Sequence, residues 1–143
     1  MRPGAGAVDG PPASVPTVEL RLPAEGNLLF LVRLVAEGIA AEGGLGLDEI
    51  ADLRVAVEEA VATLAVRADD GAVLDCAFRR TDRVTVCVAT SSAAVLPPGP
   101  GEVGWHLLRA LADSVASWTE PARGEGGWRL CLEFTKDIRE GGP

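Results

Sequence analysis

The sequence predicts an α/β two-layer sandwich, in which a mixed, mainly antiparallel sheet is covered on one face by three helices. Three observations support this fold. Short segments with alternating apolar residues indicate strands, two long stretches with a 3.6-residue apolar period indicate adjacent helices, and turn-sized polar breaks separate the later strand segments. The expected order is β-α-α-β-β-α-β-β, and antiparallel strands with helices on one side form a two-layer architecture.

The N-terminal half begins with an expected strand at residues 17–22. We expect Asn27 to cap the first helix, whose apolar residues recur at 28, 31, 32, 35 and 39. The glycine-rich run 43–46 ends this helix, because glycine favours helix termini over helix interiors.

The second helix is expected at about 49–67, with Asp48 as its N-cap. One face of this helix carries Asp52, Glu59 and Thr63, which are separated by seven and four residues and therefore lie on the same side. Its apolar stripe consists of Ile50, Leu53, Val57, Ala60, Val61 and Leu64.

The C-terminal half alternates between strand and helix patterns. Strands are expected at 74–78 and 84–88, a proline-containing loop at 90–101, a strand starting near Trp118 and a final strand at 128–134. A third helix is expected to begin near Gly104. Its expected buried residues are Trp105, Leu108, Leu111, Ala112 and Val115.

Length and composition indicate one folded domain. The chain has 143 residues, of which 48% are hydrophobic, so a wholly disordered chain is excluded. We expect a disordered Pro/Gly-rich tail at 1–16, the folded domain at 17–136 and a polar tail at 137–143. The apolar runs are too short to span a bilayer and no signal-peptide pattern is present, so we expect a cytoplasmic protein.

Charge and metal-ligand content exclude several function classes. A net charge of −8 disfavours direct binding to nucleic acid or to anionic membranes. The three cysteines, Cys76, Cys87 and Cys131, form no CxxC pair, so no metal site is expected. They are interpreted as small buried side chains in a reducing compartment. The single histidine, His106, is interpreted as an exposed or packed helix residue rather than a catalytic one.

Two segments resemble the nucleotide-binding motifs of one family. Residues 52–68, DLRVAVEEAVATLAVRA, resemble the N-box helix of GHKL (histidine-kinase-like) ATPases, and residues 101–115, GEVGWHLLRALADSV, resemble the helix after their Gly-x-Gly loop. With the opening ELRLPAEGNLLFLVRLV at 19–35, the order and spacing are most similar to the anti-sigma-factor serine kinases of the RsbW and SpoIIAB type, and within them to the actinobacterial UsfX type. The resemblance covers roughly residues 17–136 and implies a GHKL (Bergerat-like) fold.

The resemblance implies a nucleotide site that has lost most of its elements. Glu59 falls on the position of the general base and Thr63 on that of the Mg²⁺-ligating Asn. Thr90 replaces the adenine-reading Asp, and Gly104 matches the second glycine of the Gly-x-Gly loop. Glu102 takes the place of the first glycine, where its carboxylate repels phosphate, and no lysine or arginine lies between 84 and 108 to offset that charge. Glu59 is alternatively a solvated helix residue paired with Arg33 or Arg67.

The resemblance also implies a docking surface on the first helix. Arg33 falls on a partner-contacting arginine of the family, and Glu37 follows one turn on. Leu29 and Phe30 widen the apolar stripe beyond one core face, and exposed apolar area marks partner sites. The alternative is that Leu29 and Phe30 are buried against the sheet or a second protomer.

Two functional hypotheses follow from this resemblance. The first is an anti-sigma factor that sequesters an alternative (stress or developmental) sigma factor, with weak or absent binding of Mg-ATP and no other cofactor. A STAS-domain antagonist would compete for it, and the protein would form a homodimer. The second is an active serine kinase that phosphorylates this antagonist, with Glu59 as its base. A scaffold that has lost both roles is a third reading.

Overall fold

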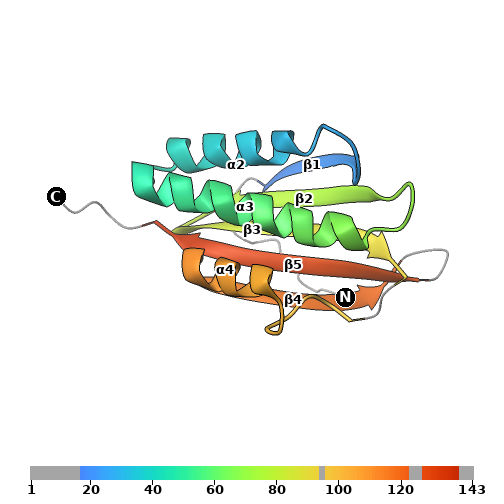
Figure 1. Cartoon of the computed structure of the whole chain (residues 1–143). Coiled ribbons are helices and arrows are strands. Elements are labelled where there is room, and N and C mark those ends of the chain that lie inside the picture. The colour runs from blue at the N-terminus through green and yellow to red at the C-terminus, as the bar shows by residue number, and fades with distance from the viewer. Residues whose placement is uncertain (1–16, 94–95, 123–126, 139–143) are drawn as a thin grey trace, which may run out of the picture.

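The computed structural model describes residues 17–93, 96–122 and 127–138 (Figure 1). The expected tail at 1–16 and residues 139–143 of the expected C-terminal tail lie outside the described residues. The predicted order of elements is confirmed. The elements are β1 Thr17–Pro23, α2 Phe30–Glu42, α3 Leu47–Arg67, β2 Val73–Arg80, β3 Arg83–Ser92, α4 Val103–Leu111, β4 Ser114–Pro121 and β5 Trp128–Asp137.

The five strands form one sheet in the order β1-β2-β3-β5-β4. All four strand pairings are antiparallel, so the parallel component of the expected mixed sheet is absent among the described strands. β3 lies at the centre of the sheet, and β1 and β4 form its edges. Strand alternation places one set of side chains toward the helices and leaves the other set on an open face.

The three helices lie on one face of the sheet, and α3 runs across its centre (Figure 1). The core between the layers includes Phe78, Phe134, Leu53 and Leu64, all fully buried. This confirms the predicted two-layer sandwich and the predicted apolar stripe of the second helix, apart from half-buried Ile50. No helix in the described part of the chain is long and apolar enough to cross a bilayer.

Both predicted helix caps are wrong. Leu29 precedes α2 with helical φ and ψ (−62° and −22°) and no side-chain cap, and the amides of Leu31 and Val32 donate to the carbonyls of Leu28 and Leu29. A turn therefore supplies the partners that Asn27 was expected to supply. The extended residue before α3 is Gly46, so Asp48 lies within the first helical turn, where its charge favours the helix dipole.

The third helix is shorter than its apolar pattern indicates. α4 ends at Leu111, and Lys136 of β5 donates to the Leu111 carbonyl at 2.7 Å. The amide of Asp113, two residues after Leu111, donates to the Thr135 carbonyl of β5 at 2.8 Å. Val115 therefore belongs to β4 and not to the helix, because sheet pairing starts as soon as α4 is capped. Likewise, β3 extends through Thr90 to Ser92, where a loop was expected.

The three cysteines are free thiols within the sheet. Cys76 and Cys131 are buried and Cys87 is half-buried, so the prediction of buried side chains holds for two of them. Burial raises the pKa of Cys76 and of Cys87 to about 12 and that of Cys131 to about 11. Nearby carboxylates, Asp75 for Cys76 and Glu133 for Cys87, raise the pKa further. These thiols stay protonated in the folded protein at neutral pH.

The raised thiol pKa values predict a loss of stability in alkaline solution. The unfolded chain releases the thiol protons near their ordinary pKa of 9.0, whereas the folded chain retains them up to about 11–12. The free energy of unfolding should thus be independent of these thiols below pH 9. Above pH 9 it should fall by up to about 1.4 kcal/mol per pH unit for each thiol. Urea titrations at several pH values measure this.

The chain contains no tyrosine that would titrate in the same range. A variant with all three cysteines replaced by alanine is the control, and its stability should depend less on pH above 9. Equal slopes for the two proteins would contradict the prediction.

Candidate functional site

The first candidate region lies where α3 meets the first turn of α4. Thr63 donates from its hydroxyl to the Glu59 carboxylate at 3.4 Å, one helical turn away. Gly104 packs directly on this pair, so a Cβ at position 104 would collide with the Glu59 carboxylate. The structure therefore brings Glu59, Thr63 and Gly104, three positions that the resemblance singles out, into direct contact with one another.

Glu102 lies beside them and is neutralised from α3. Its carboxylate accepts from Arg67 with 2.6 Å between Nη2 and Oε1. Arg67 lies 35 residues before Glu102, so no local pattern in the sequence indicates this cation. The expected pairing of Glu59 with Arg33 or Arg67 is wrong, because Arg33 pairs with Glu58 and Arg67 with Glu102.

Thr90 is separated from this cluster by its position inside the sheet. Its side chain is 1% exposed, and its hydroxyl donates to the Val73 carbonyl at 2.9 Å. Because Thr90 is buried, its hydroxyl oxygen is closed to the adenine amino group from which the resemblance implies it would accept a hydrogen bond. His106 lies on the exposed side of α4, in agreement with the non-catalytic interpretation.

The second candidate region is a groove between α2 and α3. It has a volume of about 220 Å³ and contains the predicted partner-binding residues Leu29, Phe30 and Arg33. Phe30 is 49% exposed, so the predicted excess apolar surface on the first helix is present. Its full lining is Leu29, Phe30, Arg33, Val57, Glu58, Val61 and Ala62.

A network of ion pairs lies along one side of the groove. Arg33 pairs with Glu58 at 3.1 Å, and Glu37 lies 4.0 Å from Arg33 and 3.4 Å from Arg54. Arg33 Nε and Glu37 Oε2 are buried atoms without a hydrogen-bond partner. These two atoms form the 4.0 Å ion pair with each other, so the part of Arg33 open to a partner is the rest of its side chain, which is 33% exposed.

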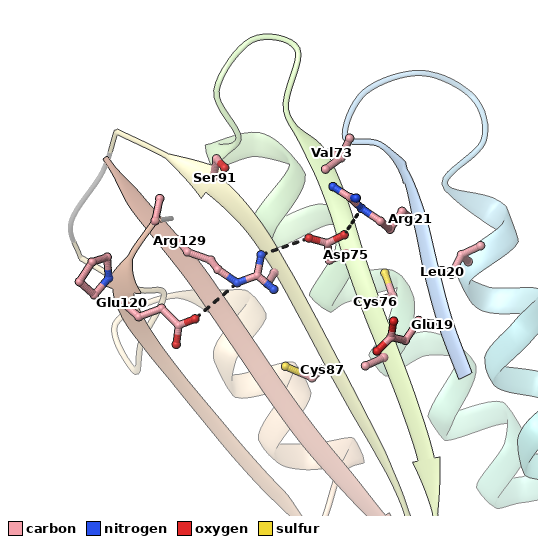
Figure 2. Close-up of a pocket in the computed structure, with 14 residues that line it drawn as sticks. Glu19, Leu20, Arg21, Val73, Asp75, Cys76, Cys87, Ser91, Glu120 and Arg129 are labelled. Atoms are coloured by element: carbon pink, nitrogen blue, oxygen red, sulfur yellow. Dashed lines mark hydrogen bonds and ion pairs between the residues drawn. The ribbon is translucent and has the colours of Figure 1, made fainter. Parts of the chain in front are cut away.

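The third candidate region is a hollow of about 720 Å³ on the open face of the sheet (Figure 2). Small side chains, Ala77, Cys87 and Ala89, form part of its floor. Around them runs a row of ion pairs across the strands. Arg21 pairs with Asp75 at 2.7 Å, Arg129 with Asp75 at 3.1 Å, and Arg129 with Glu120 at 3.5 Å.

The described residues contain no cluster of three or more histidine, cysteine or acidic side chains arranged for a metal ion.

Comparison with known proteins identifies relatives of one kind. No protein-family model matches the chain. The anti-sigma-F factor RsbW of Mycobacterium tuberculosis is 35% identical over 109 residues, which are 73% of this chain and 62% of the relative. The serine-protein kinase RsbW of Bacillus velezensis is 43% identical over 47 residues, 33% of this chain and 29% of that protein.

A solved structure supports the same assignment of the fold. It contains the RsbU and RsbW domains of Rv1364c from Mycobacterium tuberculosis, and it matches 89% of this chain and 35% of that one, with a TM-score of 0.51 and 20% identity. In sequence the chain is similar to proteins named RsbW, and in fold it is similar to a solved structure that contains an RsbW domain. It spans less than two thirds of the length of the mycobacterial relative. The finer placement in the UsfX branch stays a prediction.

The residues of this chain do not fit a bound Mg-ATP in the way the resemblance implies. The buried Thr90 hydroxyl donates to the Val73 carbonyl, and Gly104 is packed against Glu59. Glu102 places a carboxylate at the start of α4. Glu59 is retained for the kinase alternative, and its carboxylate lies against Gly104 of α4.

The misfit predicts that Mg-ATP leaves the thermal stability of the protein unchanged. A ligand at about 100 times its dissociation constant adds about 2.7 kcal/mol, which corresponds to roughly 5–10 °C in melting midpoint for a domain near this size. We expect a shift below about 1 °C at millimolar Mg-ATP, measured by differential scanning fluorimetry. Mg²⁺ alone and a non-hydrolysable analogue serve as controls, and a reproducible shift of several degrees would restore the kinase hypothesis.

Proposed function

We propose that this chain is an anti-sigma factor that sequesters an alternative sigma factor and so regulates transcription, without needing a nucleotide. The observation that carries this proposal is the apolar groove between α2 and α3, with Arg33 at its edge. Its support comes from the family: the mycobacterial relative carries the name anti-sigma-F factor. An antagonist of the STAS fold that competes for the sigma factor belongs to the same proposal.

The groove supplies both parts of a specific docking site. Phe30 and Leu29 offer apolar surface to an inserted side chain of the partner. Arg33 offers a guanidinium to a carboxylate of the partner, and the acidic Glu37 and Glu58 beside it favour neighbouring basic groups. The overall charge of −8 favours a partner with basic regions.

Copurification tests the proposed function. The protein should retain one sigma factor when it is expressed with each sigma factor of its own genome in turn. Binding to none of them would reject the proposal. An added labelled-ATP assay with the antagonist would detect phosphoserine if the chain were instead a kinase.

Two groove variants should weaken the complex without unfolding the protein. Phe30→Ala removes exposed apolar contact area, and Arg33→Glu reverses the charge at the groove edge, so we expect each to raise the dissociation constant by roughly tenfold or more. Isothermal titration calorimetry measures this.

Matched controls separate the groove from general effects of truncation. Leu47→Ala removes a side chain that is 86% exposed at the start of α3, and Arg109→Ala removes an exposed arginine on α4. Both should bind the sigma factor normally. Equal losses in control and groove variants would place the docking site elsewhere.

We further propose that the homodimer forms through the open face of the sheet. In sheet order the charged row reads Arg21 on β1, Asp75 on β2, Arg129 on β5 and Glu120 on β4, with β3 between the inner two. A two-fold axis along β3 reverses this row, so every arginine of one copy faces a carboxylate of the other. The small floor residues allow the two sheets to approach closely.

A bulky charge on the floor should abolish this dimer. Ala77→Arg inserts a long side chain between the two sheets, and we expect it to convert a dimer into a monomer in sedimentation equilibrium. Ala110→Arg on the exposed side of α4 is the control and should leave the dimer intact. A monomeric parent protein at about 100 μM would contradict the proposed dimer, which needs micromolar affinity to matter.

A further inference from the structure

The salt bridge between Arg67 and Glu102 joins the C-terminus of α3 to the N-terminus of α4. Arg67 is the last residue of α3 and Glu102 immediately precedes α4. A cation at a helix C-terminus and an anion at a helix N-terminus each interact favourably with the helix dipole. The pair therefore gains from both helices as well as from its own contact of 2.6 Å.

The orientation of both side chains is fixed by further hydrogen bonds. Arg67 Nη1 donates to the Thr63 carbonyl at 2.9 Å, which holds the guanidinium along α3 while Nη2 reaches Glu102. The second carboxylate oxygen of Glu102 accepts from the Gly99 amide at 3.4 Å, and the Glu102 amide donates to the Gly99 carbonyl at 3.0 Å. One carboxylate thus connects α3, the loop and α4.

The loop is also attached to the sheet on its other side. Ser117 of β4 donates to the carbonyl of the buried Pro98 at 2.6 Å. Prolines at 97, 98 and 100 restrict the conformations that the loop gains on release, so less entropy opposes its attachment. The loop 96–102 is therefore held between α3 and β4.

We propose that the Arg67–Glu102 salt bridge is a built-in closure that holds the loop 96–102 and the first turn of α4 over Glu59 and Thr63. The closure takes place through the chain's own side chains at the position where the family resemblance implies phosphate contacts. Gly104 permits it, because a larger residue would have to displace Glu59. This proposal does not depend on the anti-sigma function, since it concerns the free protein alone.

Hydrogen exchange of the free protein tests the closure. Arg67→Met and Glu102→Gln each remove one charge with little change of shape. We expect either variant to accelerate exchange of the amides at 99–106 roughly three- to tenfold, a modest factor because the pair is partly exposed. Exchange in α2 should stay unchanged, because that helix does not contact the pair. Arg109→Ala is the matched control on α4 and should leave 99–106 unaffected.

The double variant separates a shared closure from two independent contributions. If the two residues act as one unit, Arg67→Met with Glu102→Gln should exchange no faster at 99–106 than the faster single variant. Multiplied effects in the double variant, or unchanged exchange in both single variants, would overturn the proposal. Circular dichroism of each variant confirms that the fold is retained, and Arg67→Lys, which keeps the charge but loses the fork geometry, should show an intermediate acceleration.

Discussion

The packing of α3 is the constraint on which the rest of the structure depends. This single helix of 21 residues presents its apolar stripe to the centre of the sheet, and Leu53, Val57 and Leu64 are fully buried there. The remaining circumference is divided between two neighbours. One flank forms the groove with α2, and the opposite flank carries Thr63 and Arg67 toward α4. Because one rigid helix fixes both flanks, the position of the docking groove and the closeness of α4 follow from the same core packing.

Patterns that depend on burial could be predicted from the sequence, and patterns that depend on local polar contacts could not. Strand alternation and helical periodicity record which side faces the core, so all eight elements were predicted in the correct order. Asn27 failed as a cap because the carbonyls of the preceding turn accept from the first helical amides, and Asp48 failed because the extended residue before α3 is Gly46. Val115 failed because Lys136, 25 residues away from Leu111, ends α4. No local sequence signal contains these long-range partners.

The candidate sites also divide into features that the sequence pattern predicts and contacts that only the structure shows. Phe30 was predicted because an apolar stripe wider than one core face is visible in the sequence, and Arg33 because it matches a partner-contacting arginine in the resemblance. The structure places both residues on a groove. The ion pairs around them involve Glu58 and Arg54 from another helix and were beyond sequence reasoning. The open face of the sheet left no recognisable signal either. Its small residues and alternating charges acquire meaning only when the strand order β1-β2-β3-β5-β4 sets them side by side.

The substitutions at the nucleotide positions are mutually consistent once they are viewed as packing. Thr63 is small enough to bond Glu59 without keeping α4 away, and Gly104 has no side chain to oppose the approach. Glu102, which repels phosphate, is favourable at the start of α4 when Arg67 stands opposite. The residues at these positions thus form one contact between α3 and α4.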